Sequence, residues 1–134
     1  MTRGQKIAFQ VIFYLYLAAV LFLCFGHFES VPSVKLSLWG IPMDKIVHFV
    51  MFFPFPILAF LAFDQYSKTV SAALIFVLVT LALGVLLAIG TEWGQAHLTT
   101  HRSGDPKDLV SDCLALGLSS GLVFIWDICK LKRK

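Results

Sequence analysis

Long apolar runs dominate the chain, and the polar residues gather in short segments between these runs. A hydrocarbon layer about 30 Å thick takes close to 20 residues of helix. Four runs approach that length, at residues 7–25, 46–63, 70–91 and 109–126. The pattern therefore predicts an all-α fold, a four-helix transmembrane bundle that forms a single domain over residues 1–134.

Two of these runs contain interruptions. The second includes Pro54 and Pro56, which remove backbone hydrogen bonds and bend a helix, so neighbouring helices must satisfy the freed carbonyl groups. The fourth includes Asp112 and a Gly117-x-x-x-Gly121 stripe, a common close-packing surface between membrane helices. By helical angle the stripe lies beside the face of Asp112. We expect it to pack within the bundle, with a dimer seam as the alternative.

Composition supports a membrane protein and excludes several other classes. Of the 134 residues, 58% are hydrophobic and 14% are charged, and the mean hydropathy is +0.83. Soluble domains carry about 25% charged residues, and a chain this short leaves roughly a third of its surface exposed after folding. A soluble domain, a disordered chain and a nucleic-acid-binding protein are therefore not expected. The three cysteines form no C-x-x-C pair, so we expect them to be packing residues: Cys24, Cys113 and Cys129.

The charged residues predict an orientation. If the N-terminus is cytoplasmic, seven of the eleven basic residues lie inside, which agrees with the positive-inside rule. The outer side then holds four basic residues, Lys35, Lys45, Arg102 and Lys107. It also holds six of the eight acidic residues, Glu29, Asp44, Glu92, Asp105, Asp108 and Asp112. Both termini are thus predicted to be cytoplasmic, with a net charge of −2 outside and +5 inside.

A first group of candidate functional residues opens the second run. Asp44 and Lys45 precede His48, and Asp44 shares a helix face with His48. Asp44 is explained equally well as a helix cap or a dipole partner. A titratable histidine inside a membrane segment is costly, however, and indicates function. The pair also supplies a carboxylate that can orient an imidazole for acid–base chemistry.

A second group ends the third run. Glu92 and Gln95 share a face if the helix continues through them. A solvated helix end is one explanation. A glutamate at a helix C-terminus is disfavoured by the helix dipole, however, and a residue placed against local preference indicates function.

The third group surrounds the start of the fourth run. Asp105 as N-cap, Pro106 as first helical residue and Asp108 in the first turn make a good helix start. None of these roles explains Asp112, which falls in the second turn and points into the bundle. A buried unpaired carboxylate is expensive, so Asp112 requires a partner. The candidates are His48 and Arg102, and a purely structural pair with Arg102 is one alternative.

Together these residues resemble the VanZ-like family, which is named after a teicoplanin-resistance protein. The resemblance covers residues 44–121 and lies in Asp44-Lys45-x-x-His48-Phe49, Glu92-x-x-Gln95 and Arg102-x-x-Asp105-x-x-Asp108-x-x-x-Asp112, followed by Gly117 and Gly121. It implies a small helical membrane protein associated with reduced susceptibility to a glycopeptide antibiotic. The family pattern often has asparagine where this chain has Asp112, so the site here is more acidic.

The resulting hypothesis is a site for a lipid-linked cell-envelope headgroup, such as a polyprenyl-linked precursor, at the outer face of the bacterial cytoplasmic membrane. Carboxylates and an imidazole would handle hydroxyl groups and protons; the catalytic candidates are Asp44, His48, Glu92 and Asp112. Arg102 and the N-termini of the second and fourth helices would face a phosphate. The ligand-binding candidates are Lys45, Gln95, Arg102, Asp105 and Asp108.

Other functions remain open at this point. The protein could be a non-catalytic interaction or structural component whose polar network only stabilises the bundle. A divalent cation held by Glu92, Asp108, Asp112 and His48 is a further alternative, although we expect no cofactor and no resident metal. Ion transport is disfavoured, because the strongly polar residues lie on one side and mark no path through the bilayer. The sequence leaves the substrate, catalysis and the oligomeric state open.

Overall fold

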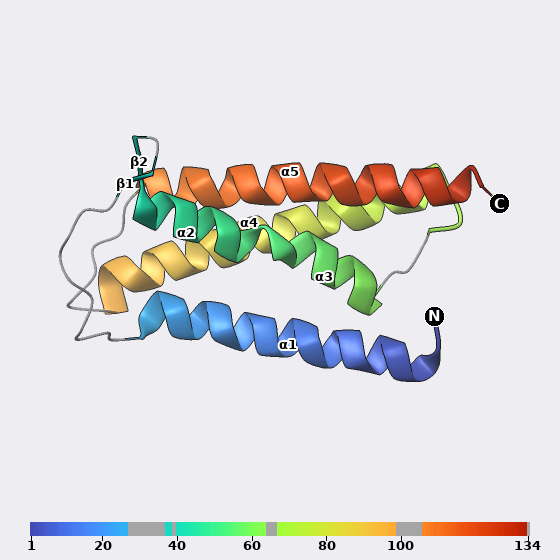
Figure 1. The fold of residues 1–134 in the computed structure, drawn as a ribbon, viewed down its shortest axis with the longest axis horizontal. Helices are drawn as coiled ribbons and strands as arrows, with labels where there is room; N and C mark the ends of the chain where they lie inside the picture. Colours follow the sequence, from blue (N-terminus) through green and yellow to red (C-terminus); the bar gives the residue numbers. More distant parts are fainter. Residues whose placement is uncertain (27–36, 39, 64–66, 99–105, 134) are drawn as a thin grey trace.

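The computed structural model describes residues 1–26, 37–38, 40–63, 67–98 and 106–133. Figure 1 shows an elongated bundle of helices whose two chain ends lie at the same end. The helices are α1 (Arg3–Phe25), α2 (Met43–Phe52), α3 (Pro54–Phe63), α4 (Val70–Leu98) and α5 (Pro106–Leu131). Two short strands, β1 (Ser37–Leu38) and β2 (Ile41–Pro42), pair antiparallel.

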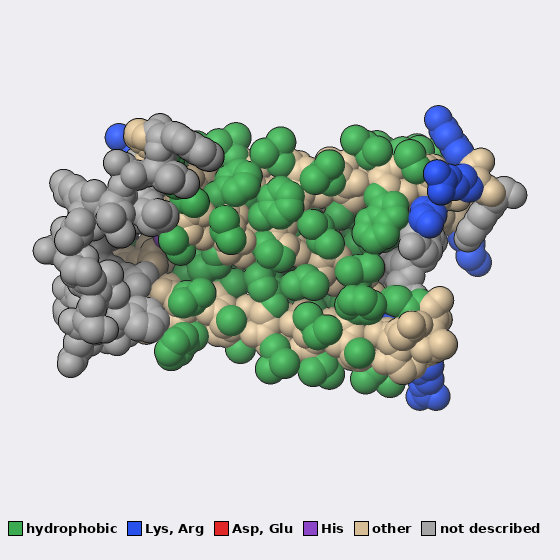
Figure 2. All heavy atoms as spheres, viewed as in Figure 1, with side chains coloured by type: hydrophobic (Ala, Val, Ile, Leu, Met, Phe, Trp, Pro, Cys, Tyr) green, Lys and Arg blue, Asp and Glu red, His purple; other side chains and the backbone are tan. Residues whose placement is uncertain are grey.

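In the described part of the chain, four helical segments are long and apolar enough to cross a membrane. They are α1, the combined segment Lys45–Phe63, α4 and α5. The predicted all-α four-helix bundle is therefore confirmed. Figure 2 shows the consequence on one flank, where hydrophobic side chains cover the middle of the molecule.

The helices extend further than the apolar runs. Helix α4 continues past Thr91 to Leu98, and α5 begins at Pro106, as its start signals predicted. Hydropathy marks the part of a helix that suits lipid, whereas backbone hydrogen bonding continues into polar sequence. The interpretation of Glu92 as a residue at a helix C-terminus is wrong as a result, because the dipole acts only within the last turn and α4 continues for more than one turn beyond Glu92.

Side chains near the termini of the helices fix where α1 and α4 begin. Thr2 and Gln5 form a reciprocal capping box at the start of α1. At the start of α4, Thr69 Oγ1 accepts a hydrogen bond from the backbone nitrogen of Ala72. Each interaction satisfies a backbone donor that the helix itself leaves without a partner.

The second span is divided at Phe53, just before Pro54, into α2 and α3. A proline lacks the N–H that continues a helix, so carbonyl groups near the break need other donors. The hydroxyl of Tyr16 in α1 donates to the carbonyl oxygen of Met51. A neighbouring helix therefore supplies a donor to one carbonyl next to the break. The carbonyls that Pro54 and Pro56 themselves leave without an N–H are those of Val50 and Phe52, and their satisfaction stays a prediction.

Two further side chains tie α1 to its neighbours. Gln10 Nε2 donates to the carbonyl oxygen of Ala62 near the end of α3, at 3.3 Å. Gln95 Nε2 in α4 donates to the carbonyl oxygen of Cys24 near the end of α1, at 2.9 Å. Interhelical hydrogen bonds of this kind hold membrane helices together where lipid is as apolar as the core.

Close packing in the bundle centre depends on Gly84 of α4. A Cβ atom at this position would lie 2.7 Å from a methyl carbon of Leu116 and 3.1 Å from the ring of Phe55. Both neighbours are buried, and they belong to α5 and α3. The absence of a side chain at Gly84 therefore allows three helical elements to meet.

The glycine stripe of α5 does not play this role. Gly117 and Gly121 are exposed, and an added Cβ would meet no atom within 4 Å. The expectation that they pack within the bundle is wrong, because the face that α5 buries carries other residues, among them Asp112 and Leu116. The expected packing role of the cysteines holds for Cys24, which is buried, whereas Cys129 is exposed.

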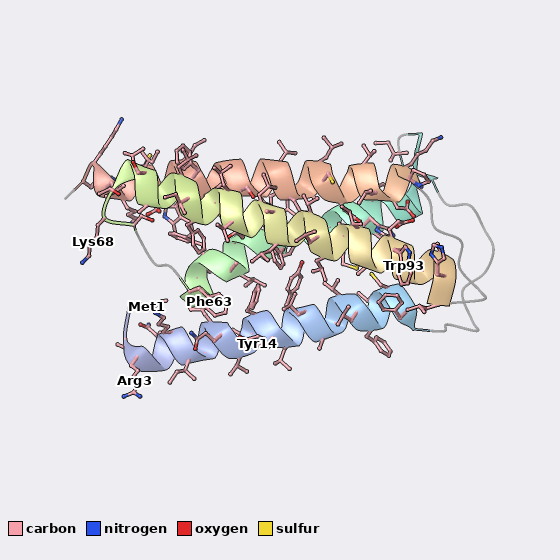
Figure 3. The ribbon with its side chains drawn as sticks, turned by 180° about the vertical axis from the view of Figure 1, so that it is seen from behind. Met1, Arg3, Tyr14, Phe63, Lys68 and Trp93 are labelled. Carbon is pink, nitrogen blue, oxygen red and sulfur yellow. The ribbon has the colours of Figure 1, made fainter. Side chains whose placement is uncertain are left out.

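The two ends of the bundle differ. Figure 3 places Met1, Arg3 and Lys68 at one end and Trp93 at the other. In the view of Figure 2, Lys and Arg side chains gather at the end with the termini. The opposite end carries the β1–β2 hairpin and the starts of α2 and α5 (Figure 1). Gly40 turns this hairpin with a φ of +77°, a conformation that favours glycine.

Replacing Tyr16 with phenylalanine tests the bond at the proline break. The substitution keeps the ring but leaves the carbonyl of Met51 without this donor, so we expect the free energy of unfolding in detergent to fall by about 1–2 kcal/mol. Tyr14→Phe is the control, because Tyr14 is 60% exposed. Equal stability of the two variants would contradict the role assigned to Tyr16.

Gly84→Ala tests the close approach of the helices. The added methyl group overpacks a buried site, and such changes cost about 1–3 kcal/mol. The matched control is Gly90→Ala on the same helix, where an added Cβ meets no atom within 4 Å and alanine favours the helix. We expect thermal unfolding in detergent micelles to show a lower midpoint for Gly84→Ala alone.

Candidate functional site

Polar residues of α2 and α5 meet where both helices begin. The two helices lie side by side there (Figure 1). Lys45 and His48 are three residues apart on α2, and Asp108 and Asp112 are four residues apart on α5, so each pair shares one helix face. Since both helices start at this end, Lys45 lies level with Asp108, and His48 lies level with Asp112 one turn further in. We call these four residues the polar ladder.

The outer pair of the polar ladder is an ion pair. Lys45 Nζ donates to Asp108 Oδ1 at 2.6 Å, and only 12% and 11% of the two side chains is exposed. A short hydrogen bond between charged groups is stronger than a neutral one. Low exposure also makes the loss of either partner costly, because the remaining charge loses its close counterpart away from water.

The inner pair joins an imidazole to a buried carboxylate. His48 Nδ1 lies 3.0 Å from Asp112 Oδ1, and His48 Nε2 lies 3.6 Å from Asp108 Oδ2. When Asp112 is ionised, its carboxylate only accepts hydrogen bonds, and the proton of this bond then resides on Nδ1 of His48. In a neutral imidazole Nε2 is then an acceptor. This is the arrangement in which a carboxylate orients a histidine as a proton acceptor.

Asp112 is the most deeply placed residue of the polar ladder. Its exposure is 0%, and its second oxygen, Oδ2, has no hydrogen-bond partner in the described part of the chain. The carboxylate of Glu92 in α4 interacts electrostatically with His48. Among the described side chains, the hydrogen-bond partner of Asp112 is the imidazole of His48 in α2.

The predicted candidates have three outcomes. The structure brings Lys45, His48, Asp108 and Asp112 together and places Glu92 beside them; His48 is thus the partner that Asp112 requires. Gln95 is buried, and its amide nitrogen binds the end of α1. The side chain of Asp44 is not described, and Arg102 and Asp105 lie outside the described residues. A role for these three residues stays a prediction.

Two residues that matter were not among the sequence candidates. Tyr16 looks like an ordinary aromatic residue of an apolar run, and nothing in its spacing indicates a partner across the bundle. Asp127 is 1% exposed near the other end of α5, where its Oδ1 accepts the backbone N–H of Ser67 at 3.0 Å. The helical spacing in the sequence could have indicated Asp127, because it lies on the same buried face of α5 as Asp112.

The geometry of the polar ladder also bears on the alternative of a divalent cation, which stays untested. Among the described residues, no group of three or more His, Cys, Asp or Glu side chains is placed to hold a metal ion. The ring nitrogens of His48 face carboxylate oxygens of Asp108 and Asp112. These contacts are of the kind that hydrogen bonding and proton exchange use.

Comparison with known proteins gives no further guidance on this site. No family model, curated protein or solved structure matches the chain. Any functional conclusion therefore depends on the residues and their geometry, and the resemblance to the VanZ-like family stays a prediction.

A double-mutant cycle tests the outer pair of the polar ladder. Lys45→Met and Asp108→Asn should each lower the free energy of unfolding in detergent by about 3 kcal/mol, because each removes one charge of a low-exposure ion pair. The double variant should lie within about 1 kcal/mol of the wild type, since no such charge remains. Purely additive losses would show that the two side chains do not interact.

Proposed function

We propose that this chain is a VanZ-like integral protein of the bacterial cytoplasmic membrane. Its polar ladder, on the extracytoplasmic side, binds or acts on the headgroup of a lipid-linked cell-envelope precursor. The observation that supports this proposal is the inner pair: a histidine held by a carboxylate of 0% exposure inside a membrane-spanning bundle. Titratable groups in this setting are costly and mark functional sites.

The location of the polar ladder favours a lipid headgroup as the ligand. The ladder lies within the first two turns of α2 and α5, at the end of two spans whose outward flanks are apolar. A lipid headgroup occupies this depth of the membrane, with its chain alongside the bundle. The N-termini of α2 and α5 carry partial positive charge, which suits the phosphate of a polyprenyl-linked precursor.

The charge distribution supports the proposed orientation. The end that holds the polar ladder is opposite the end that holds both termini (Figure 1). The basic residues near the termini include Arg3, Lys6, Lys68, Lys130, Lys132 and Arg133. Because basic residues flank spans on the cytoplasmic side, the polar ladder would face outward. Glycopeptide antibiotics bind envelope precursors from that side, which connects the site to the susceptibility that the family resemblance implies.

Two activities at this headgroup are compatible with the polar ladder: binding alone, and binding followed by catalysis. Binding requires its charges and hydrogen-bonding groups alone. Catalysis additionally requires His48 Nε2 to take a proton from a hydroxyl group of the headgroup or from water, with Asp112 holding the ring. His48 would then be the catalytic base and Asp112 its positioning residue.

Binding of a polyprenyl-diphosphate-linked precursor to the protein in nanodiscs tests the proposal. We expect His48→Ala to weaken binding by about tenfold or more, a change of roughly 1.4 kcal/mol. The matched control is His97→Ala, since His97 is an exposed histidine at the same end of the bundle and should leave binding unchanged.

A stability measurement on the same variants separates binding from a purely structural ladder. If the polar ladder only held the helices together, His48→Ala would lower the free energy of unfolding and leave the affinity of the folded fraction at the wild-type value. That result would overturn the proposed function.

A further inference from the structure

The described side chains of the site carry more negative than positive charge. Asp108, Asp112 and Glu92 supply three carboxylates, whereas Lys45 and His48 supply at most two positive charges. Asp108 and Asp112 are buried, and low exposure strengthens the effect of their charges on a group nearby.

A second observation concerns hydrogen bonding and is independent of the charge. Asp112 Oδ1 is occupied by His48, while Oδ2 is buried and has no partner in the described part of the chain. A buried acceptor without a donor costs free energy. A ligand that brings an N–H or O–H to Oδ2 would remove that cost, whereas a group that only accepts hydrogen bonds would not.

We propose that the headgroup recognised by the polar ladder carries a primary ammonium group, which donates a hydrogen bond to Asp112 Oδ2. This inference rests on the proposed function and names the chemistry of its ligand. At Asp112 Oδ2 a hydroxyl group brings a donor without charge, and a phosphate or carboxylate would bring negative charge beside a carboxylate. The phosphate of the proposed precursor would lie instead at the N-termini of α2 and α5. Among these groups, only an ammonium supplies both the donor and the opposite charge.

The site already accommodates an ammonium group of its own. Lys45 Nζ lies 2.6 Å from Asp108 Oδ1, one helical turn from Asp112. The partial exposure of this pair, 12% and 11%, places it between the outside and the fully buried carboxylate of Asp112. A headgroup ammonium that approaches past this pair would repeat the same contact one turn deeper.

Short-chain lipids that differ only in the amine test the inference on the wild-type protein in detergent. The probes are dihexanoyl phosphatidylethanolamine, its N-acetylated form, dihexanoyl phosphatidylglycerol and free ethanolamine. We expect the free-amine lipid to bind about tenfold or more tightly than the N-acetylated lipid and phosphatidylglycerol, a difference of roughly 1.4 kcal/mol. Weak binding of free ethanolamine would identify the lipid-anchored amine as the ligand, whereas binding as tight as that of the lipid would identify the amine alone.

Asp112→Asn tests the contact itself. The amide keeps the size of the side chain but removes its charge and places a donor near the ammonium. The variant should therefore bind the free-amine lipid and the N-acetylated lipid about equally. Ser120→Ala is the control, because Ser120 lies on the same helix and its buried hydroxyl has no hydrogen-bond partner among the described residues. It should keep the preference.

The outcomes separate this inference from the proposed function. If the N-acetylated lipid or phosphatidylglycerol binds as tightly as the amine in the wild type, the ammonium is refuted while headgroup binding stands. If none of these lipids and no polyprenyl-linked precursor binds, both proposals fail. If the Asp112→Asn variant still prefers the free-amine lipid, the assigned contact is refuted. The binding is measured on the folded fraction of the variant, so a partial loss of folding does not affect this test.

Discussion

The burial of one carboxylate, that of Asp112, constrains how the helices are arranged at the end of the bundle that holds the polar ladder. Asp112 has 0% exposure, and an ionised group taken out of water requires a partner at close range. His48 provides it at 3.0 Å. Because this bond joins the second turns of α2 and α5, it also fixes how the two helices are aligned, and it brings Lys45 level with Asp108. The outer ion pair thus follows from the same alignment as the inner one.

The proline break makes this alignment compatible with the rest of the fold. Helix α2 packs mainly on α5, whereas α3 packs mainly on α1, so one membrane span contacts two partners by changing direction at Phe53. Next to this break the hydroxyl of Tyr16 donates to the carbonyl oxygen of Met51, which joins the divided span to α1.

The sequence alone predicts the four membrane spans and part of the polar ladder. Apolar length predicts four helices, and helical spacing predicts that Asp112 turns inward and needs either His48 or Arg102. Spacing along one helix identifies a shared face but does not identify the helix that the face meets. For that reason the partnership of Tyr16 with Met51 could not be predicted. The same limit explains why the glycine stripe was misassigned: Gly117 and Gly84 look alike in sequence, and only the neighbours at 2.7–3.2 Å distinguish Gly84.

Two buried aspartates on the same face of α5 show why burial alone does not identify a functional site. Asp127 lies near the end that carries the termini and accepts the backbone N–H of Ser67, just before α4. A backbone donor next to a helix start is part of the fold, so this carboxylate has a structural role. Asp112 instead shares one oxygen with an ionisable side chain and keeps the other without a donor in the described part of the chain. Folding alone would favour a second donor or an apolar residue at this position. The retained acceptor, beside a histidine that can exchange a proton, is therefore the feature that a ligand explains and helix packing does not.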